Sequence, residues 1–364
     1  MFKKTSVLMA LLIVFSIVLA QCAPAPVPTE APAAPAAPAA VEPTSAPAAV
    51  EPTAAPAAAE PAVALKVAAI FPGVITDADY NTLAYEGLMA LKDEMKLEVA
   101  YSESVAVPDV DRVMREYVDA GFNVVWTHGG QFVNQTVELA KQFPEISFIA
   151  EGDAAVKEPP ANLWFIDRNF HTGYYAIGAL AAKATKTGKI GYIGGQTLPF
   201  SYAEVHAIQQ AIKDSGATVE FKPVWAGDFN DPTKARQVAD AMISEKVDVI
   251  MGSLNLGMLG VFEAAKASKD KVLVTAKYTD KTSFAPDNYI TSLVYDFKNP
   301  LKEIVGKIQA GENGGYYALG FDNSVSFQFP LINVDTTVNT EIEKIVNDVK
   351  SGTVKVAKDN TPIE

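Results

Sequence analysis

The sequence has few of the residues that build disulfides, metal centres and catalytic sites. It holds one cysteine, Cys22, and three histidines among 364 residues. One cysteine excludes an intramolecular disulfide, and the histidines lack metal-ligand spacing. The chain also lacks a G-x-S-x-G elbow, a Walker loop and a G-x-G-x-x-G fingerprint. We therefore expect a protein that is not an enzyme, with no metal, no cofactor and no catalytic residue.

Basic residues are also in deficit. The chain carries 30 Lys and Arg against 43 Asp and Glu, for a net charge of -13. A negative protein surface repels the phosphates of nucleic acids and anionic lipids. Nucleic acid and other anionic partners that would need a positively charged protein surface are therefore excluded.

The first 22 residues have the pattern of an export signal. Lys3 and Lys4 precede an apolar run from Val7 to Ala20, which is short for a bilayer span but typical of a signal peptide. We expect residues 1–21 to be a signal peptide. Cys22 follows at a position that resembles a bacterial lipobox, in which the cysteine is lipidated, although Gln21 replaces the usual small residue. The alternative is an incidental cysteine after a plain signal peptide.

Residues 22–62 form a low-complexity segment of Ala, Pro, Glu, Thr and Val, in which Val41–Thr44 recurs as Val50–Thr53. Without aromatic residues, this segment cannot bury enough surface to offset the entropy of ordering. Extended Pro-rich chains rise ~3.1 Å per residue, so a tether on the order of 100 Å is possible. We expect an exported protein that is tethered by a lipid to the extracellular or periplasmic face of the cell membrane.

The remaining chain is long enough for two modest domains. Short apolar runs alternate with amphipathic stretches, a pattern typical of parallel sheets with right-handed helical crossovers. The predicted strands are Lys66–Phe71, Leu97–Ser102, Asn123–Thr127, Ile146–Ala150, Leu163–Ile166, Lys189–Ile193, Val219–Val224, Asp248–Met251, Val272–Thr275, Tyr289–Val294 and Val325–Phe329.

A weak internal repeat has a spacing of 125 residues. The strand at 123–127 and Glu138–Lys141 correspond to the strand at 248–251 and Glu263–Lys266. The repeat predicts two similar α/β lobes that face each other. Since ligands of open parallel sheets bind beyond the carboxyl ends of the strands, residues just after each strand are the candidates for a binding site.

The loop after the first strand carries Asp77, Asp79, Tyr80 and Asn81. Carboxylates and an amide can hydrogen-bond sugar hydroxyls, and a tyrosine ring can stack on a flat base. The alternative is that Asp77 or Asp79 caps the following helix.

The other candidates also follow predicted strands. Gly129 would let a ligand approach the backbone closely, while His128 is either a ligand contact or a local hydrogen-bonding group. Trp225 is the strongest aromatic candidate, and Tyr295 belongs to either the cleft or a hinge. The remaining candidates are Gln131, Phe200, Tyr202, Asn255, Tyr278 and Asp280.

Several segments form a further pattern: Asp77-Ala78-Asp79-Tyr80-Asn81 with Glu86-Gly87, Gly173–Ala182, Thr187–Gly195, Gly227–Pro232 and Val261–Lys266. Together these motifs resemble the basic membrane protein family of ABC-transporter substrate-binding lipoproteins, which includes bacterial purine-nucleoside receptors.

The resemblance implies a type I periplasmic-binding-protein fold, with two doubly wound parallel-sheet domains joined by a three-crossover hinge. The lobes would comprise residues 66–167 plus 290–320 and residues 168–289 plus 321–358. It also implies that a purine stacks between rings, with Asp77 and Asn81 as polar anchors and Tyr80 as a ring contact.

The chain departs from the nucleoside-receptor pattern at several positions. Asp79 replaces a serine, Glu204 stands where a phenylalanine is expected, and Tyr295 replaces a lysine. The turn Ala276–Asp280 retains only the second acid of the family's pair. A nucleobase or another flat heterocycle is therefore as consistent with the pattern as a complete nucleoside.

The favoured function is capture of a small solute by hinge closure, for delivery to an ABC permease and its ATPase, by a monomer. One alternative is a receptor that reports ligand occupancy to a membrane signalling partner. The other is a cell-surface hydrolase with Asp77 and Asp79 as paired carboxylates.

Overall fold

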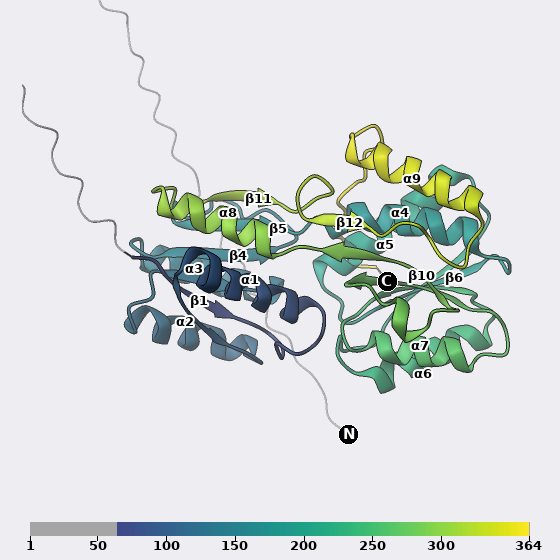
Figure 1. Ribbon diagram of the computed structural model, residues 1–364, viewed down its shortest axis with the longest axis horizontal. Helices are drawn as coiled ribbons and strands as arrows, with labels where there is room; N and C mark the ends of the chain where they lie inside the picture. Colours follow the sequence, from purple (N-terminus) through teal and green to yellow (C-terminus); the bar gives the residue numbers. More distant parts are fainter. Residues whose placement is uncertain (1–63, 364) are drawn as a thin grey trace, which may run out of the picture. The chain divides into compact units, whose positions relative to one another are not determined.

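The computed structural model of the protein describes residues 64–363 (Figure 1). The predicted signal peptide, Cys22 and the Pro-rich segment lie outside the described residues.

The first sheet is built from strands that pair in parallel throughout, in the order β11-β5-β4-β3-β1-β2. We refer to this sheet and its helices as the first lobe. Its strands are β1 (Lys66–Ile70), β2 (Glu98–Ser102), β3 (Val124–Thr127), β4 (Ser147–Gly152), β5 (Leu163–Asp167) and β11 (Gly315–Ala318).

The second sheet has the order β12-β10-β9-β8-β6-β7 and, with its helices, forms the second lobe. β12 runs antiparallel to β10, whereas the other pairs are parallel. Its strands are β6 (Lys189–Gly194), β7 (Glu220–Trp225), β8 (Val249–Ser253), β9 (Leu273–Tyr278), β10 (Tyr289–Tyr295) and β12 (Val325–Phe327).

The two sheets repeat one topology, because β6 to β10 occupy the same relative places as β1 to β5. α3 (Val133–Gln142) and α7 (Met258–Ala267) follow the equivalent strands β3 and β8. The predicted repeat is therefore confirmed. The other helices are α1 (Tyr80–Met95), α2 (Val110–Asp119), α4 (Phe170–Ala184), α5 (Pro199–Ser215), α6 (Pro232–Ser244), α8 (Lys298–Gln309) and α9 (Thr336–Lys350).

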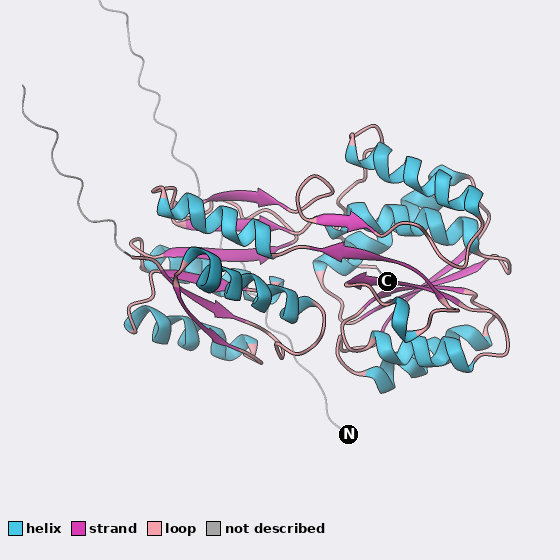
Figure 2. Cartoon of the chain, viewed as in Figure 1, coloured by secondary structure: helices cyan, strands magenta, loops and turns pink. Residues whose placement is uncertain are grey.

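Helices cover both faces of each sheet (Figures 1 and 2). In β3, Val124 and Trp126 join the apolar cluster that contains residues of α1 and α8, whereas Val125 joins the cluster of α2 and α3. In the second lobe, α6 and α7 lie on one side of the sheet, with α4, α5 and α9 on the other (Figure 1). Because side chains alternate between two buried faces, these strands appear in the sequence as continuous apolar runs.

Within residues 64–363, three connections join the sheets: β5 to α4, β10 to α8, and β11 to β12. The predicted three-crossover hinge is thus present. Residues 290–320 were predicted to lie in the first lobe, but β10 pairs with β9 and belongs to the second sheet. β11 was missed because it is short and presents the exposed ring of Tyr316. The other lobe limits remain predictions.

The chain after α9 contacts both lobes. In the second lobe, Gln210 of α5 accepts a hydrogen bond from the Ala357 amide at 3.0 Å. In the first lobe, Asn360 donates to the carbonyl of Asp153 at 2.9 Å, and Lys358 pairs with Asp167. This C-terminal segment therefore bridges the lobes beside the first crossover.

The packing of α4 on α5 depends on a close approach at Gly178. A Cβ atom there would lie 2.8 Å from the Ile208 Cα, a backbone atom that cannot move independently of its helix. We expect Gly178→Ala to lower the melting temperature, because overpacking costs about 1–3 kcal/mol and outweighs the gain of about 1 kcal/mol in helix propensity. Calorimetry would measure the shift.

Gly306 in α8 is the matched control, because a Cβ atom there meets nothing within 4 Å. Gly306→Ala should leave the melting temperature unchanged or raise it. A Gly178→Ala protein as stable as the Gly306→Ala protein would contradict this account of the α4–α5 interface.

Candidate ligand-binding site

A cavity of about 420 Å³ lies where the loops after the strands of the two sheets meet. The first lobe contributes residues that follow β1, β2 and β3, and the first crossover contributes the residue that follows β5. The second lobe contributes residues that follow β6, β7 and β8 together with the last residue of β9. Six predicted site residues line this cavity: Tyr80, Asn81, Gln131, Phe200, Asn255 and Tyr278. The rule that ligands bind beyond the carboxyl ends of parallel strands therefore located it.

Aromatic rings form much of the cavity wall. Phe200 and Phe229 lie nearly parallel, with ring centroids 6.0 Å apart and planes at 23°. Tyr80 of the first lobe and Tyr278 of the second approach each other with centroids at 5.5 Å. Tyr278 has a φ of 78°, a left-handed conformation that costs an L residue about 1–2 kcal/mol. Rings from both lobes thus offer flat apolar surfaces to a ligand.

Asp77 is fully buried and acts as the cap of α1. Its carboxylate accepts hydrogen bonds from the backbone amides of Asp79 at 3.0 Å, Asn81 at 3.1 Å and Thr82 at 3.0 Å. It also accepts from the side-chain amides of Asn81 at 2.7 Å and Asn255 at 3.2 Å. Asp77 lies behind the cavity wall, so the capping alternative describes it better than direct ligand contact does.

Asp79 pairs with the second lobe. Its Oδ1 lies 2.5 Å from the Lys281 Nζ and accepts a hydrogen bond from the Thr279 hydroxyl at 3.0 Å. Burial raises the pKa of Asp79 to about 7, against the opposing effects of the Lys281 charge and of hydrogen bonds from Lys281 and Thr279. Asp79, which stands where the family pattern has a serine, thus links the two lobes.

A buried network supports the ring of Tyr80. The Tyr80 hydroxyl donates to the Glu151 Oε2 at 3.0 Å, and its ring stacks on His128 with centroids 3.8 Å apart. His128 contacts the Glu151 Oε1 at 2.7 Å and the Tyr80 carbonyl at 3.1 Å, so acceptors face both ring nitrogens. His128 is therefore a supporting residue behind the cavity, and not one of its lining residues.

Glu151 was not predicted, although it is the centre of this network. Burial alone would raise its pKa, but the charge and hydrogen bond of His128, the charge of Arg168 and the hydrogen bond from Tyr80 hold it below its usual value. The Trp126 indole also donates to its Oε1 at 3.0 Å. An acid within the otherwise apolar strand β4 was the signal in the sequence.

Arg168 is a second residue of this region that was not predicted. It lies at the first crossover and lines the cavity. Its Nε donates a hydrogen bond to the Asp153 carboxylate at 2.9 Å, and its Nη2 pairs with the same carboxylate. Its Nη1 donates to the Tyr80 hydroxyl at 3.1 Å, and its guanidinium lies 5.0 Å from the Phe200 ring centroid. It directly follows β5, so the rule applied to the other strand ends would have identified it.

Behind the second-lobe rings lies a fully buried ion pair. The Lys277 Nζ is 2.6 Å from the Glu204 Oε1, and the Tyr192 hydroxyl donates to the same carboxylate at 2.8 Å. The ammonium lies 3.6 Å from the Phe170 centroid and 4.9 Å from that of Phe200. Burial lowers the pKa of Lys277 to about 8, while Glu204 opposes that shift. Glu204, a departure from the family pattern, is thus neutralised within the fold.

Other predicted residues lie elsewhere. Trp225 does not line the cavity, because its indole donates to Ser201 at 2.9 Å and its ring packs on Tyr202, with centroids 5.7 Å apart. Trp225 lines a separate depression beside α6. Asp280 is exposed and accepts from the Thr282 amide at 2.8 Å.

Two further predicted residues lie beside the cavity or in the hinge. Tyr295 ends β10, at the second crossover, and packs on Phe170 with centroids 4.8 Å apart. Gly129 is next to the cavity and has a φ of 150°, and a Cβ atom added to it would lie 2.8 Å from the Gln131 Oε1. Both the backbone conformation and this short distance disfavour a larger residue at position 129.

The loop after β7 supplies lining residues that were not predicted: Asp228, Phe229 and Asn230. The Asp228 carboxylate accepts from the Asn230 amide at 2.8 Å, which orders the loop. The rule that ligands bind beyond the carboxyl ends of strands applies to this loop too. The sequence-based prediction selected Trp225, the last residue of β7, in place of the residues that follow it.

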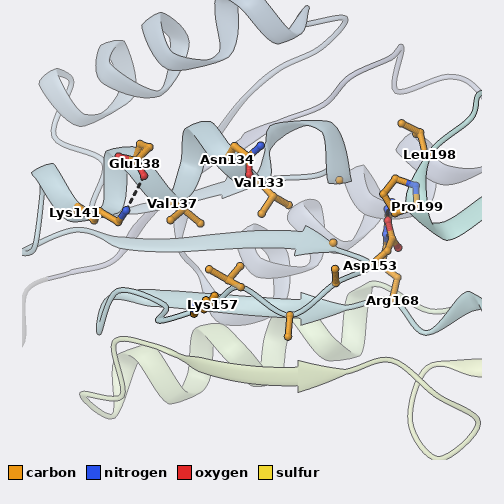
Figure 3. Close-up of a pocket in the computed structure, with 15 residues that line it drawn as sticks. Val133, Asn134, Val137, Glu138, Lys141, Asp153, Lys157, Arg168, Leu198 and Pro199 are labelled. Carbon is orange, nitrogen blue, oxygen red and sulfur yellow. Dashed lines mark hydrogen bonds and ion pairs between the residues drawn. The ribbon is translucent and has the colours of Figure 1, made fainter. Parts of the chain in front are cut away.

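A larger groove of about 570 Å³ runs along α3 and the segment 152–157 (Figure 3). Glu138 and Lys141 pair at one end, and Asp153, Arg168, Leu198 and Pro199 lie at the other (Figure 3). It shares Arg168 and Leu198 with the cavity. The Arg168–Asp153 pair therefore stands between the groove and the cavity.

The architecture is similar to that of solved solute-binding proteins. A solute-binding protein of an ABC transporter from Aeropyrum pernix superposes with a TM-score of 0.70 at 18% identity, over 81% of this chain and 94% of that one. A similar protein from Conexibacter woesei gives a TM-score of 0.64 at 22% identity, over 81% and 99%. The fold class is therefore the type I periplasmic-binding-protein fold.

The chain belongs to the Bmp family, described as "ABC transporter substrate-binding protein PnrA-like", which matches residues 64–360. It is 30% identical to basic membrane protein A2 of Borrelia garinii over 64% of this chain and 68% of that protein. It is 27% identical to basic membrane protein A of Borreliella burgdorferi over 79% and 84%. It is also 27% identical to a purine-binding protein of Brucella abortus over 63% and 65%.

The family and these solved structures are those of solute-binding proteins, not of enzymes. In the part of the chain that the structure describes, no group of three or more His, Cys, Asp or Glu side chains is arranged to hold a metal ion. Within the same residues, no helix is long and apolar enough to cross a membrane.

The buried carboxyl of Asp79 predicts a pH dependence. Since its pKa of about 7 in the folded protein exceeds the value of 3.8 for an exposed carboxyl, its stabilising contribution is greatest below about pH 4 and is lost as pH rises to about 7. Relative to Asp79→Asn, the wild-type protein should lose at most about 1.4 kcal/mol of unfolding free energy per pH unit over this range. Urea denaturation between pH 4.5 and 8 would measure it.

Asp280→Asn is the control, because hydrogen bonds from Thr282 hold the pKa of that exposed carboxyl below its usual value. The difference in unfolding free energy between this variant and the wild-type protein should stay constant between pH 4.5 and 8. A difference between wild type and Asp79→Asn that is constant, or that grows in favour of wild type as pH rises, would contradict the assignment.

Proposed function

We propose that this substrate-binding protein captures a purine nucleobase or nucleoside outside the cytoplasmic membrane and delivers it to an ABC permease. The observation that carries the proposal is the cavity between the lobes, with aromatic rings and side-chain amides in its wall. The Brucella abortus relative is named a purine-binding protein, which supports the same class of ligand.

The lining suits a flat, neutral molecule with polar edges. Tyr80, Phe200, Phe229 and Tyr278 offer ring faces, and stacking on aromatic side chains contributes ~1–3 kcal/mol per base. Amide groups of Asn and Gln can both donate and accept, as the edges of a heterocycle do. Arg168 is neutralised by Asp153, and Asp228 is the one carboxylate among the described lining residues.

Binding would act through hinge closure. A ligand in this cavity touches both lobes, so it binds the closed arrangement more tightly than an open one and shifts the population toward closure. The Asp79–Lys281 ion pair joins the loop after β1 to the loop after β9, and the Asp77–Asn255 hydrogen bond joins it to the loop after β8. The permease would recognise the closed form, and its ATPase would supply the energy for transport.

A purine should raise the melting temperature of the mature protein. At a free concentration a hundredfold above its dissociation constant, it should contribute about 2.7 kcal/mol to the unfolding free energy. Differential scanning fluorimetry with purine bases, nucleosides, sugars and amino acids would measure the shift. A clear shift with a sugar or an amino acid, and none with any purine, would overturn the ligand class.

Two variants distinguish the cavity from its surroundings. Asn81→Ala removes a lining amide and should weaken purine binding at least tenfold in titration calorimetry. Trp225→Ala removes a ring that lies outside the cavity, so the affinity should stay within about threefold of wild type once the folded fraction is matched by circular dichroism. Equal loss in both variants would place the ligand elsewhere.

Anchoring through Cys22 is the remaining part of the proposed function. In the full-length precursor expressed in a bacterial host, Cys22→Ser should abolish incorporation of labelled palmitate and move the protein from the membrane to the soluble fraction. Ser45→Cys in the Cys22→Ser background is the control, because it restores a cysteine outside the lipobox-like position. Labelling that survives in Cys22→Ser would refute lipidation at this residue.

A further inference from the structure

The buried ion pair between Lys277 and Glu204 joins the two elements that carry second-lobe rings of the cavity wall. Both side chains are fully buried, and the Lys277 Nζ lies 2.6 Å from the Glu204 Oε1. Phe200 lines the cavity and stands four residues before Glu204 in α5, so both lie on one face of that helix. Tyr278 also lines the cavity and directly follows Lys277 in β9. One ion pair therefore links the start of α5 to the end of β9.

Aromatic rings surround the ammonium group of this pair. The rings with centroids 3.6 to 5.7 Å from the Lys277 Nζ are those of Phe170, Phe200, Tyr278, Tyr174 and Tyr295. The nearest ring, Phe170, packs on Phe200 with centroids 5.7 Å apart and on Tyr278 at 6.3 Å. A cation is attracted to an aromatic face within about 6 Å, and more strongly where water is excluded. The ammonium thus attracts the lining rings and the ring behind them toward one point.

The backbone of Tyr278 needs a support of this kind. Its φ of 78° is a conformation that L residues rarely adopt, and such strain persists only where the surrounding structure fixes it. The preceding residue, Lys277, is fixed by the sheet, in which it lies opposite Leu293 of β10, and by its side-chain pair with Glu204. The ion pair therefore helps to hold the Tyr278 ring in the cavity wall.

The strength of this support depends on the charge of Lys277. Burial lowers the pKa of Lys277 to about 8, while the charge and hydrogen bond of Glu204 oppose that shift. The ammonium form makes a charge-assisted hydrogen bond and attracts the rings, whereas a neutral amine loses most of both interactions. Loss of one proton should therefore loosen the rings without changing the size of any side chain.

The other ionisable groups around Lys277 have defined effects. Arg168, which is paired with Asp153, stays charged, because these two groups interact and its pKa lies well above the usual value. The Arg168 charge lowers the pKa of Lys277, and the Asp153 charge raises it. Burial raises the pKa of the neighbouring tyrosines well above the usual value, so they stay neutral: Tyr174, Tyr192, Tyr278 and Tyr295. Among these basic and phenolic groups, Lys277 is the one that changes charge near pH 8.

We propose that Lys277 and Glu204 are positioning residues of the binding site, whose ion pair holds the rings of Phe200 and Tyr278 in the orientation on which a planar ligand stacks. The inference rests on the proposed function and adds two residues that act through the rings without lining the cavity. A ligand that stacks on these rings favours the charged form of Lys277. By linkage, the affinity for that ligand should fall as the proton leaves.

Titration calorimetry with adenosine and with adenine, which stay neutral between pH 6.5 and 9, tests the pair in the mature protein. Replacing both partners of a buried ion pair by neutral side chains is often tolerated, so Lys277→Met combined with Glu204→Gln should fold. The Gln keeps an acceptor for the Tyr192 hydroxyl, which donates to Glu204 at 2.8 Å. In protein with a native far-ultraviolet circular dichroism spectrum, the affinity at pH 7 should fall about tenfold or more.

The matched control is Lys222→Met combined with Glu245→Gln, which removes an exposed ion pair of the second lobe. Its affinity should stay within about threefold of wild type, because exposed pairs contribute little to the fold. Equal affinity of the Lys277→Met, Glu204→Gln protein and the wild-type protein would overturn the inference.

The pH profile separates a role of the charge from a role of shape alone. The wild-type affinity should fall about threefold or more between pH 7 and 9, whereas the double variant at 204 and 277 should show no such fall. Glu204→Gln keeps the shape but removes the charge that opposes the shift of Lys277, so its fall should begin at lower pH. Profiles that are flat in wild type and in Glu204→Gln would overturn the inference.

A second readout needs no ligand. Near-ultraviolet circular dichroism reports the packing of aromatic rings, and the spectrum should change near pH 8 in wild type, at lower pH in Glu204→Gln, and not in the double variant. Spectra that change alike in all three proteins would overturn the inference whether or not a purine binds. The expected spectral changes, together with binding of a sugar or an amino acid and of no purine, would refute the proposed ligand class and leave the positioning of the rings supported.

Discussion

Parallel strands present their carboxyl ends at one edge of a sheet, and the cavity between the lobes of this protein depends on that constraint. Each sheet is wound in the same order, so the loops after β1 and β3 have counterparts after β6 and β8. The cavity lies where these loops meet. Helices bury both faces of each sheet, so polar side chains can gather at low cost only at the loop-bearing edges.

Most of the buried acids near the cavity have structural roles, so the groups that face a ligand are mainly neutral. Asp77 caps α1, Asp79 pairs with Lys281, Asp153 with Arg168, and Glu204 with Lys277. Taking a charge out of water is costly unless a cationic partner or hydrogen bonds replace the solvent. Asp77 is held by hydrogen bonds from backbone and side-chain amides, and the other three acids each have a cationic partner. The result is a cavity wall of rings and amides, supported from behind by neutralised charges. Such a wall matches an uncharged heterocycle better than an ionised solute.

The fold was largely predictable from the sequence, whereas the direction of individual side chains was not. Apolar runs and their alternation with helices predicted each strand except β11, a short edge strand whose residues are mostly exposed. The strand-end rule located Asn81, Gln131 and Asn255, because it depends only on topology. It could not show that Asp77 turns back to cap its helix or that Trp225 packs on Tyr202, since those choices depend on tertiary neighbours. Arg168 and Asn230 were missed although the same rule applies to them.

The orientation of the amides links recognition to closure. Asp77 and Asn81 lie on the same loop, so their hydrogen bond persists when the lobes separate. The hydrogen bond from Asn255 crosses between the lobes and exists only when they meet. Asn255 is therefore oriented by closure itself, and Asn230 of the second lobe approaches Gly73 of the first lobe only in the same state. A ligand that contacts groups of both lobes gains all of these contacts only in the closed form, and this differential affinity is what a population shift toward closure requires.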